Sequence, residues 1–167
     1  MRKSPIIIVS LMLLIGYATA TDMPKRKPGL WEMTLSTANS KRPPRSAKYC
    51  IDAATEALMD NVAGGMTRQA CSKNDVHAEG ATVVVDSVCM IDKSKVTGRS
   101  VITANGDTML HMQIHTHFDP PLYGSADVDS MSDSKWLGAC PADMQPGDMM
   151  TPAGVKVSIR EILKAGP

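Results

Sequence analysis

The second half of the chain consists of short apolar, β-branched segments separated by turn residues, and this pattern constrains the fold more than any other feature. The segments are TVVVDSVCMI (82–91), VTGRSVIT (96–103) and TMLHMQIH (108–115). Such spacing predicts an antiparallel meander from about residue 68 onward. Asn105-Gly106 is typical of a two-residue type I′ hairpin turn, so residues whose numbers sum to 211 should face each other. Pro120-Pro121 should break the chain again, with further strands at 123–136 and 155–159.

The N-terminal part of the mature chain predicts two strands and one helix. Residues 29–37, GLWEMTLST, alternate with the two-residue period of a half-buried strand, and 47–51 is a short second strand. Asp52 is a good N-cap, and the helix formers that follow should end at Gly64-Gly65. We therefore expect an α+β domain: a curved antiparallel sheet of about six to eight strands packed with one helix and held by disulfides.

The first 20 residues have the pattern of a secretory signal peptide. A basic start is followed by an apolar run of about ten residues, which is too short for a membrane span, and then by Ala18-Thr19-Ala20. We expect cleavage after Ala20, which leaves residues 21–167 as a single periplasmic or secreted domain. The alternative is a retained N-terminal anchor. No later segment has the length and apolar character of a membrane span, so the mature chain should not cross a membrane.

Charge and cysteine content narrow the class of protein further. Removing residues 1–20 takes away two basic residues and changes the formal net charge from +1 to −1, so nucleic acid is not expected as a partner. Four cysteines in an exported chain predict two disulfides. If 79–81 is a three-residue hairpin loop, Cys71 faces Cys89, and Cys50 is left to pair with Cys140.

Several short motifs occur in an order that resembles a known family. They are KPGLWEMTLS, then YCIDAATEAL, then Cys71 and Cys89 before a meander that contains glycines, and GAC at Cys140. Together these residues, from about Lys27 to Arg160, resemble a family of bacterial exported proteins known as domain of unknown function 3617. The resemblance implies a small periplasmic domain; it supplies no catalytic residues and lends no support to a metal site.

Three of the four histidines lie within seven residues, in MLHMQIHTHF (109–118). On a strand, His111, His115 and His117 share the polar side. Residues two apart lie roughly 7 Å from each other, so His115 and His117 can converge on one ion, whereas His111 lies roughly 14 Å from His115 and cannot. The metal would be zinc or copper, because imidazole suits both. The alternative, which we favour, is that the histidines are solvated or line a ligand site.

A metal site needs further ligands, and the expected registers place few of them nearby. With the turn at Asn105-Gly106, His115 faces Val96 and His111 faces Ser100. With a loop at 119–121, Asp129 faces His111 and Asp127 faces Gln113. A shift of one residue would turn both aspartates to the other side of the strand.

Other motifs in the sequence do not indicate a further metal site or a catalytic site. The aspartates of ADVDSMSD fail the calcium-loop pattern, because Met131 stands where an oxygen ligand is needed. The 13 methionines fit a core poor in aromatic residues better than copper transport. No nucleophile elbow, P-loop or HExxH motif occurs.

We therefore expect no enzymatic activity and no cofactor, but a non-catalytic role in small-molecule or lipid binding, or in envelope maintenance. The ligand would be small and apolar or amphipathic; periplasmic metal binding by His115 and His117 is the alternative.

Overall fold

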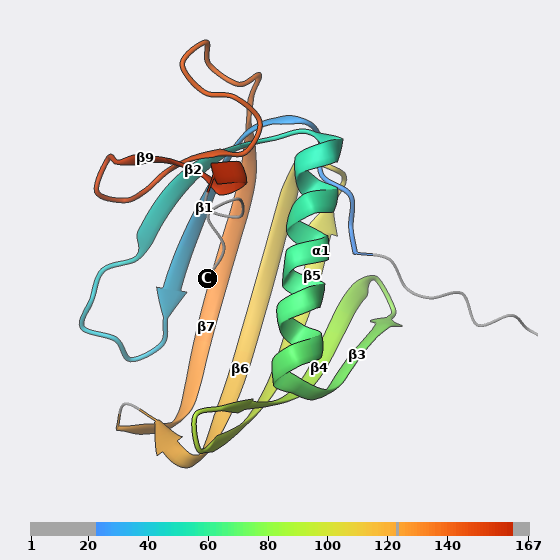
Figure 1. The fold of residues 1–167 in the computed structure, drawn as a ribbon, viewed down its shortest axis with the longest axis vertical. Helices are drawn as coiled ribbons and strands as arrows, with labels where there is room; N and C mark the ends of the chain where they lie inside the picture. Colours follow the sequence, from blue (N-terminus) through green and yellow to red (C-terminus); the bar gives the residue numbers. More distant parts are fainter. Residues whose placement is uncertain (1–22, 123, 162–167) are drawn as a thin grey trace, which may run out of the picture.

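The protein is a nine-stranded antiparallel sheet with one long helix, seen in a computed structural model that describes residues 23–122 and 124–161 (Figure 1). The predicted signal peptide and its cleavage site lie outside the described residues. The elements are β1 (Gly29–Thr37), β2 (Arg45–Ile51), α1 (Ala53–Ala70), β3 (Cys71–Glu79), β4 (Thr82–Ile91), β5 (Ser94–Asn105), β6 (Met109–Leu122), β7 (Ser125–Gly138), β8 (Asp148–Met150) and β9 (Lys156–Ser158). No helix in this part of the chain is long and apolar enough to cross a membrane.

The strand order is β3-β4-β5-β6-β7-β1-β2-β8-β9, so the sheet is open. The predicted meander forms β3 to β7, and the N-terminal hairpin β1–β2 then pairs with the far side of β7. The expected six to eight strands were too few. The additional strand is β8, a three-residue segment between turns that pairs with β2 and would not be recognised from its own sequence.

The helix begins where the sequence indicates but ends later. Asp52 accepts a hydrogen bond from the backbone N–H of Thr55 at 2.7 Å, as its N-cap position predicts. The predicted end at Gly64-Gly65 was wrong, because α1 continues to Ala70. Glycine costs only about 1 kcal/mol in a helix interior, a penalty that contacts with the sheet can offset. The chain then passes directly into β3 at Cys71.

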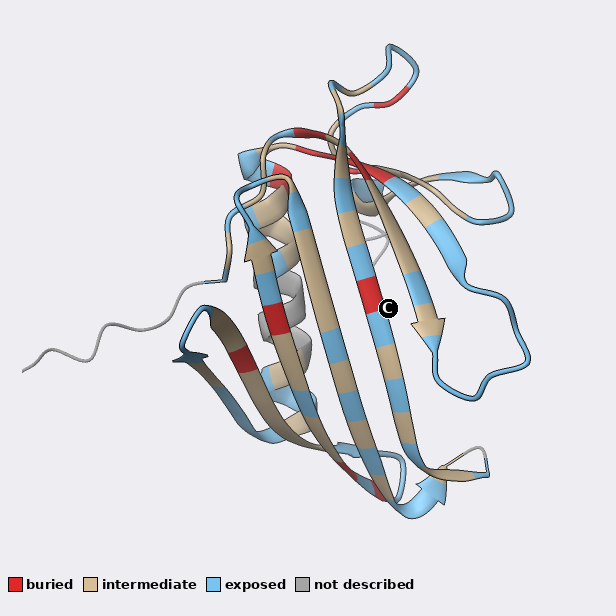
Figure 2. Ribbon diagram, turned by 180° about the vertical axis from the view of Figure 1, so that it is seen from behind, coloured by how far each residue is buried: buried red, intermediate tan, exposed pale blue. Residues whose placement is uncertain are grey.

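The best-packed core lies where β1 and β2 meet the helix. Trp31, Tyr49 and Ile51 form its buried centre. Met59 of α1 packs against this centre, which shows that the helix covers the face of the sheet that carries Trp31. The partly buried residues around it also include Met33, Trp136 and Met149. Along the central strands, tan and pale-blue residues alternate with few buried ones (Figure 2).

Two disulfides join the pairs expected from the sequence, Cys50 to Cys140 and Cys71 to Cys89. Cys71 faces Cys89 across the β3–β4 ladder, although the connecting turn differs from the expectation. Glu79 pairs with Thr82, which leaves a two-residue turn, and an irregularity between Cys71 and Lys73 restores the cysteine pairing.

The turn between β5 and β6 has three residues instead of the expected two. Asn105 pairs with Met109, so facing residues sum to 214 and not 211. Contacts with other segments hold this turn, because the backbone of Lys27 donates to the carbonyl of Asp107 and that of Trp136 to the carbonyl of Thr108, both at 2.8 Å. An odd shift in register brings the opposite face of the neighbouring strand next to a given side chain. His115 therefore faces Arg99 and not Val96, and His111 faces Thr103 and not Ser100.

The chain also continues through the proline pair that was expected to end a strand. β6 runs to Leu122 and includes a cis Asp119–Pro120 bond, and the pairing with β7 is irregular between His117 and Leu122. Proline lacks an N–H, so it fits in a strand where the ladder is interrupted. The expected strand start at Tyr123 lies outside the described residues, and β7 begins at Ser125.

Candidate functional site

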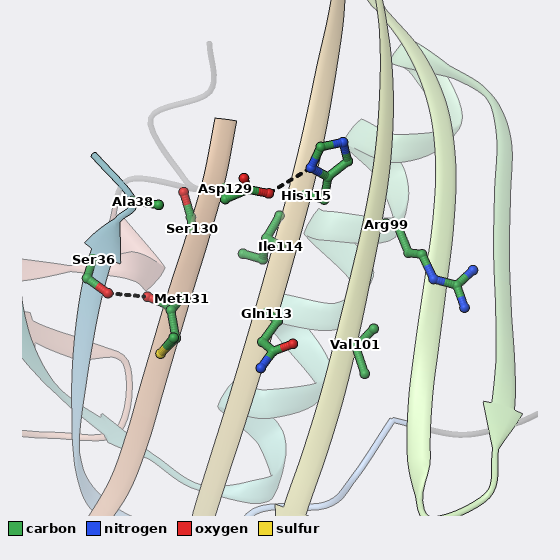
Figure 3. A pocket seen from close by; sticks show the side chains of 10 residues that line it. All are labelled: Ser36, Ala38, Arg99, Val101, Gln113, Ile114, His115, Asp129, Ser130 and Met131. Carbon is green, nitrogen blue, oxygen red and sulfur yellow. Dashed lines mark hydrogen bonds and ion pairs between the residues drawn. The ribbon is translucent and has the colours of Figure 1, made fainter. Parts of the chain in front are cut away.

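The histidines of β6 each face an aspartate of β7. Facing residues sum to 244, which pairs His111 with Asp133, His115 with Asp129 and His117 with Asp127. In each pair, the Nδ1 atom of the ring lies 2.7–2.8 Å from a carboxylate oxygen. We call the side of the sheet that carries these pairs the histidine face; it lies opposite the helix, which Figure 3 shows behind the strands.

This arrangement corrects the expected pairing of Asp127 with Gln113 and of Asp129 with His111. The register differs by four residues because the turn follows Leu122 and not Phe118, and because the pairing is irregular between His117 and Leu122. An even shift keeps the aspartates on the histidine face while it moves each one along the strand. The predicted face of the aspartates was therefore right, and their predicted partners were wrong.

His115 has two carboxylates within reach. Its Nδ1 atom lies 2.7 Å from Asp129, and its Nε2 atom lies 3.7 Å from Asp127, which also contacts Nδ1 of His117 at 2.8 Å. The hydrogen bond with Asp129 raises the pKa of His115 above its ordinary value of 6.5, and the charges of Asp129 and Asp127 add to this rise. All these side chains are about half exposed.

The structure brings the proposed metal ligands His115 and His117 to a shared aspartate, Asp127. His111 has its own partner, Asp133. In residues 23–122 and 124–161, however, the group of three potential ligands whose donor atoms all lie within 4.8 Å of one another is a different one: Asp75, His77 and Asp86.

That group belongs to a charged cluster on β3, β4 and β5 that the sequence analysis missed. Arg99 donates to both oxygens of Asp86 at 3.1 and 3.0 Å and to Glu79 at 2.6 Å. These contacts lower the pKa of Glu79, first through the bond from Arg99 and then through that from His77. Asp75 and Asp86 face each other because the hairpin turn has two residues. A Gly80-Ala81 turn was the signal that could have revealed this pairing.

A cavity of about 370 Å³ lies on the histidine face (Figure 3). Its apolar lining includes Ala38, Val101 and Met131, and its polar lining includes Gln113 and His115. A second hollow, of about 500 Å³, lies farther along the same strands beside His111 and Asp133. The His115–Asp129 pair lines the first hollow and the His111–Asp133 pair lines the second.

Comparison with known proteins assigns the chain to a family. The model of the family described as "Protein of unknown function (DUF3617)" matches residues 26–140, which is more than half of the chain. The chain belongs to the DUF3617 family. No curated protein and no solved structure matches it.

The DUF3617 match confirms the resemblance inferred from the cysteine and tryptophan motifs. The matched region runs from just before β1 to Cys140, so it contains both disulfides and the whole of the histidine face. Strands β8 and β9 lie beyond it.

Proposed function

We propose that this DUF3617 protein is an exported, non-catalytic binding protein whose ligand site is the cavity beside His115. The observation that carries the proposal is the cavity itself, because its volume of about 370 Å³ falls in the usual range for small-molecule sites. Two disulfides and the signal-like N-terminus support an oxidising, extracytoplasmic location, either periplasmic or secreted.

The lining of the cavity supports an amphipathic ligand. Val101 and Met131 offer apolar contact, while Gln113 and His115 offer polar groups at the same opening. Asp129 contacts Nδ1 of His115 and raises the pKa of the ring, which leaves Nε2 as the ring nitrogen that can meet a polar group of the ligand. A lipid or another envelope component with this chemistry would give the protein a role in envelope maintenance.

Filling the cavity tests this proposal. The probe is 8-anilinonaphthalene-1-sulfonate, a small amphipathic anion whose fluorescence rises when it leaves water. Val101→Trp should abolish most of the fluorescence increase, because an indole ring would occupy the cavity. Thr97→Trp is the matched control, since Thr97 lies on the same strand and the same face but is not part of the cavity lining. Equal dye binding by both variants, with unchanged unfolding midpoints, would contradict the proposal.

Native mass spectrometry of untagged protein from the exporting cell provides an independent check. A co-purified small molecule that is retained by Thr97→Trp and lost from Val101→Trp identifies the ligand class. A molecule retained by both variants would place the binding site elsewhere.

A second candidate function is the binding of zinc or copper by His115 and His117. The observation in its favour is Asp127, whose carboxylate oxygen lies 3.7 Å from one ring and 2.8 Å from the other. Elemental analysis of untagged protein tests it. The ion content should fall in His115→Ala/His117→Ala and stay unchanged in His111→Ala, and equal contents in all three proteins would rule the candidate out.

A further inference from the structure

We infer that Asp75, His77 and Asp86 form a binding site for a divalent transition-metal ion, with zinc as the best fit. Their donor atoms all lie within 4.8 Å of one another, on the β3–β4 hairpin. None of these three residues lines the cavity, although Arg99, which contacts Asp86, does line it and faces His115. The inference does not depend on the proposed function.

The two aspartates occupy positions that favour a cation between them. Asp75 and Asp86 are direct cross-strand partners, and like charges in such positions destabilise a sheet unless something compensates them. Arg99 compensates Asp86 and Glu79. Three carboxylates and one guanidinium leave a net charge of −2 when His77 is neutral, and one divalent ion balances this charge.

The imidazole of His77 is oriented as a metal ligand usually is. Its Nε2 atom lies 3.1 Å from Glu79, which fixes the ring and places the proton on Nε2. Metal-bound histidines commonly donate their other N–H to a carboxylate in this way. The remaining atom, Nδ1, then carries a lone pair; it is buried and has no hydrogen-bond partner.

The distance between two of the donors fits zinc. Nδ1 of His77 lies 3.3 Å from a carboxylate oxygen of Asp75, but not in hydrogen-bonding geometry. Two ligands of a tetrahedral zinc ion with bonds of about 2.0–2.1 Å lie roughly 3.3–3.4 Å apart. One nitrogen and two carboxylate donors suit zinc, whereas calcium and magnesium prefer oxygen ligands throughout. Three protein ligands leave a fourth position for water.

Arg99 does not prevent the ion from binding, because it uses only some of the lone pairs of the Asp86 carboxylate. A carboxylate offers about four lone-pair sites, so Asp86 can accept from Arg99 and still bind a metal. Arg99 also bonds Glu79, which in turn holds His77. Glu79 and Arg99 therefore act as positioning residues that keep two of the three ligands in place.

Zinc titration by calorimetry tests the inference, with untagged protein that has first been freed of metal. Losing an outer partner of a zinc ligand weakens affinity roughly 10- to 100-fold, so losing the imidazole of His77 should cost at least that much. We expect this loss in His77→Ala and in Asp75→Asn, and an unchanged affinity in His115→Ala/His117→Ala. Unfolding midpoints measured without metal show whether each variant is folded.

A measurement on the unsubstituted protein keeps the inference testable if the variants do not fold. In ¹⁵N NMR, zinc should shift the Nδ1 resonance of His77 much more than its Nε2 resonance, and should leave His111 unchanged. Zinc shifts confined to His115 and His117, or zinc affinity that His77→Ala does not change, would overturn the inference. Dye binding to the cavity should be the same in His77→Ala as in the parent, so failure of this site and failure of the proposed function are distinguishable.

Discussion

Around β1 and β2 the buried side chains are large and aromatic. In contrast, β3 and β6 carry all four histidines of the chain, whose charged neighbours lie on β3, β4, β5 and β7. Trp31 is fully buried and its Nε1–H donates to the carbonyl of Lys27 at 2.8 Å. The side chains of His111, His115 and His117, in contrast, are 38–55% exposed. The same sheet thus has an end built for packing and a face of titratable groups open to solvent.

The packed end supplies most of the stability of this fold, whereas the exposed face supplies its titratable groups. Exposed ion pairs contribute at most about 1 kcal/mol each, so the histidine–aspartate pairs are poor sources of stability. Buried aromatic residues contribute several times as much. The pairs can therefore be substituted one at a time without unfolding the protein.

The largest expected contrast lies between the two disulfides. In the chain-entropy model, the Cys50–Cys140 bridge at the aromatic end, with a sequence separation of 90, contributes about 4.6 kcal/mol. The Cys71–Cys89 bridge on β3–β4, with a separation of 18, contributes about 3.2 kcal/mol. Guanidinium unfolding of the two double Cys→Ser variants should show the larger loss for Cys50 and Cys140. The reverse order would show that the β3–β4 bridge contributes more stability than the bridge at the aromatic end.

The next largest contrast in the free energy of unfolding should come from substituting one buried residue on β1 and one on β4. Trp31→Ala should cost about 3–5 kcal/mol, because it removes an indole ring. Val84→Ala removes only two methyl groups and should cost about 1.5–2.5 kcal/mol. Both side chains are fully buried, so the two substitutions differ in the size of the side chain that is removed and not in its exposure to solvent. Trp31→Phe is the control for the lost hydrogen bond and should fall between the two. Equal losses of unfolding free energy for Trp31→Ala and Val84→Ala in denaturant would contradict the expectation that the aromatic end contributes more stability than β4.

A smaller effect is expected at Asp52, where the aromatic end passes into the helix. Asp52→Ala should lower the free energy of unfolding by about 1 kcal/mol, because the N–H of Thr55 loses its acceptor. Asp52→Asn keeps the acceptor and should lose less. The bonds from Thr55, followed by the charge of Arg160, lower the pKa of Asp52, so its contribution should be lost as the pH falls through this lowered pKa. Thermal melts at neutral and acidic pH would measure both effects.

The smallest effect is the pH dependence of His115 on the exposed face. Its pKa lies above 6.5, so the stabilisation from the Asp129 pair is fully present below 6.5 and is lost as the pH rises through the raised value. An NMR titration should show a lower pKa for His115 in Asp129→Asn. Asp133→Asn is the matched control, since Asp133 contacts His111. A pKa of His115 that Asp129→Asn leaves unchanged would contradict the assigned partner.

Local patterns predicted much of the fold. The alternation of GLWEMTLST placed β1 at residues 29–37, and the side chain of Asp52 marked the start of α1. The candidate site was predicted only in part. Alternation placed the histidines of β6 on one face. The face of the β7 aspartates and the partners of both sets depended on turns whose lengths were misjudged. The Asp75–His77–Asp86 group was missed for the same reason.

The sequence by itself determined which residues alternate, where the helix begins, which cysteines pair and to which family the chain belongs. The tertiary structure decided the registers of β5, β6 and β7, and with them that His115 lies between Arg99 and Asp129. The physical reason is that alternation repeats every two residues along a strand. It specifies the face of each side chain, whereas its neighbour across the ladder depends on the turns, which contacts from distant segments such as Lys27 and Trp136 hold in place.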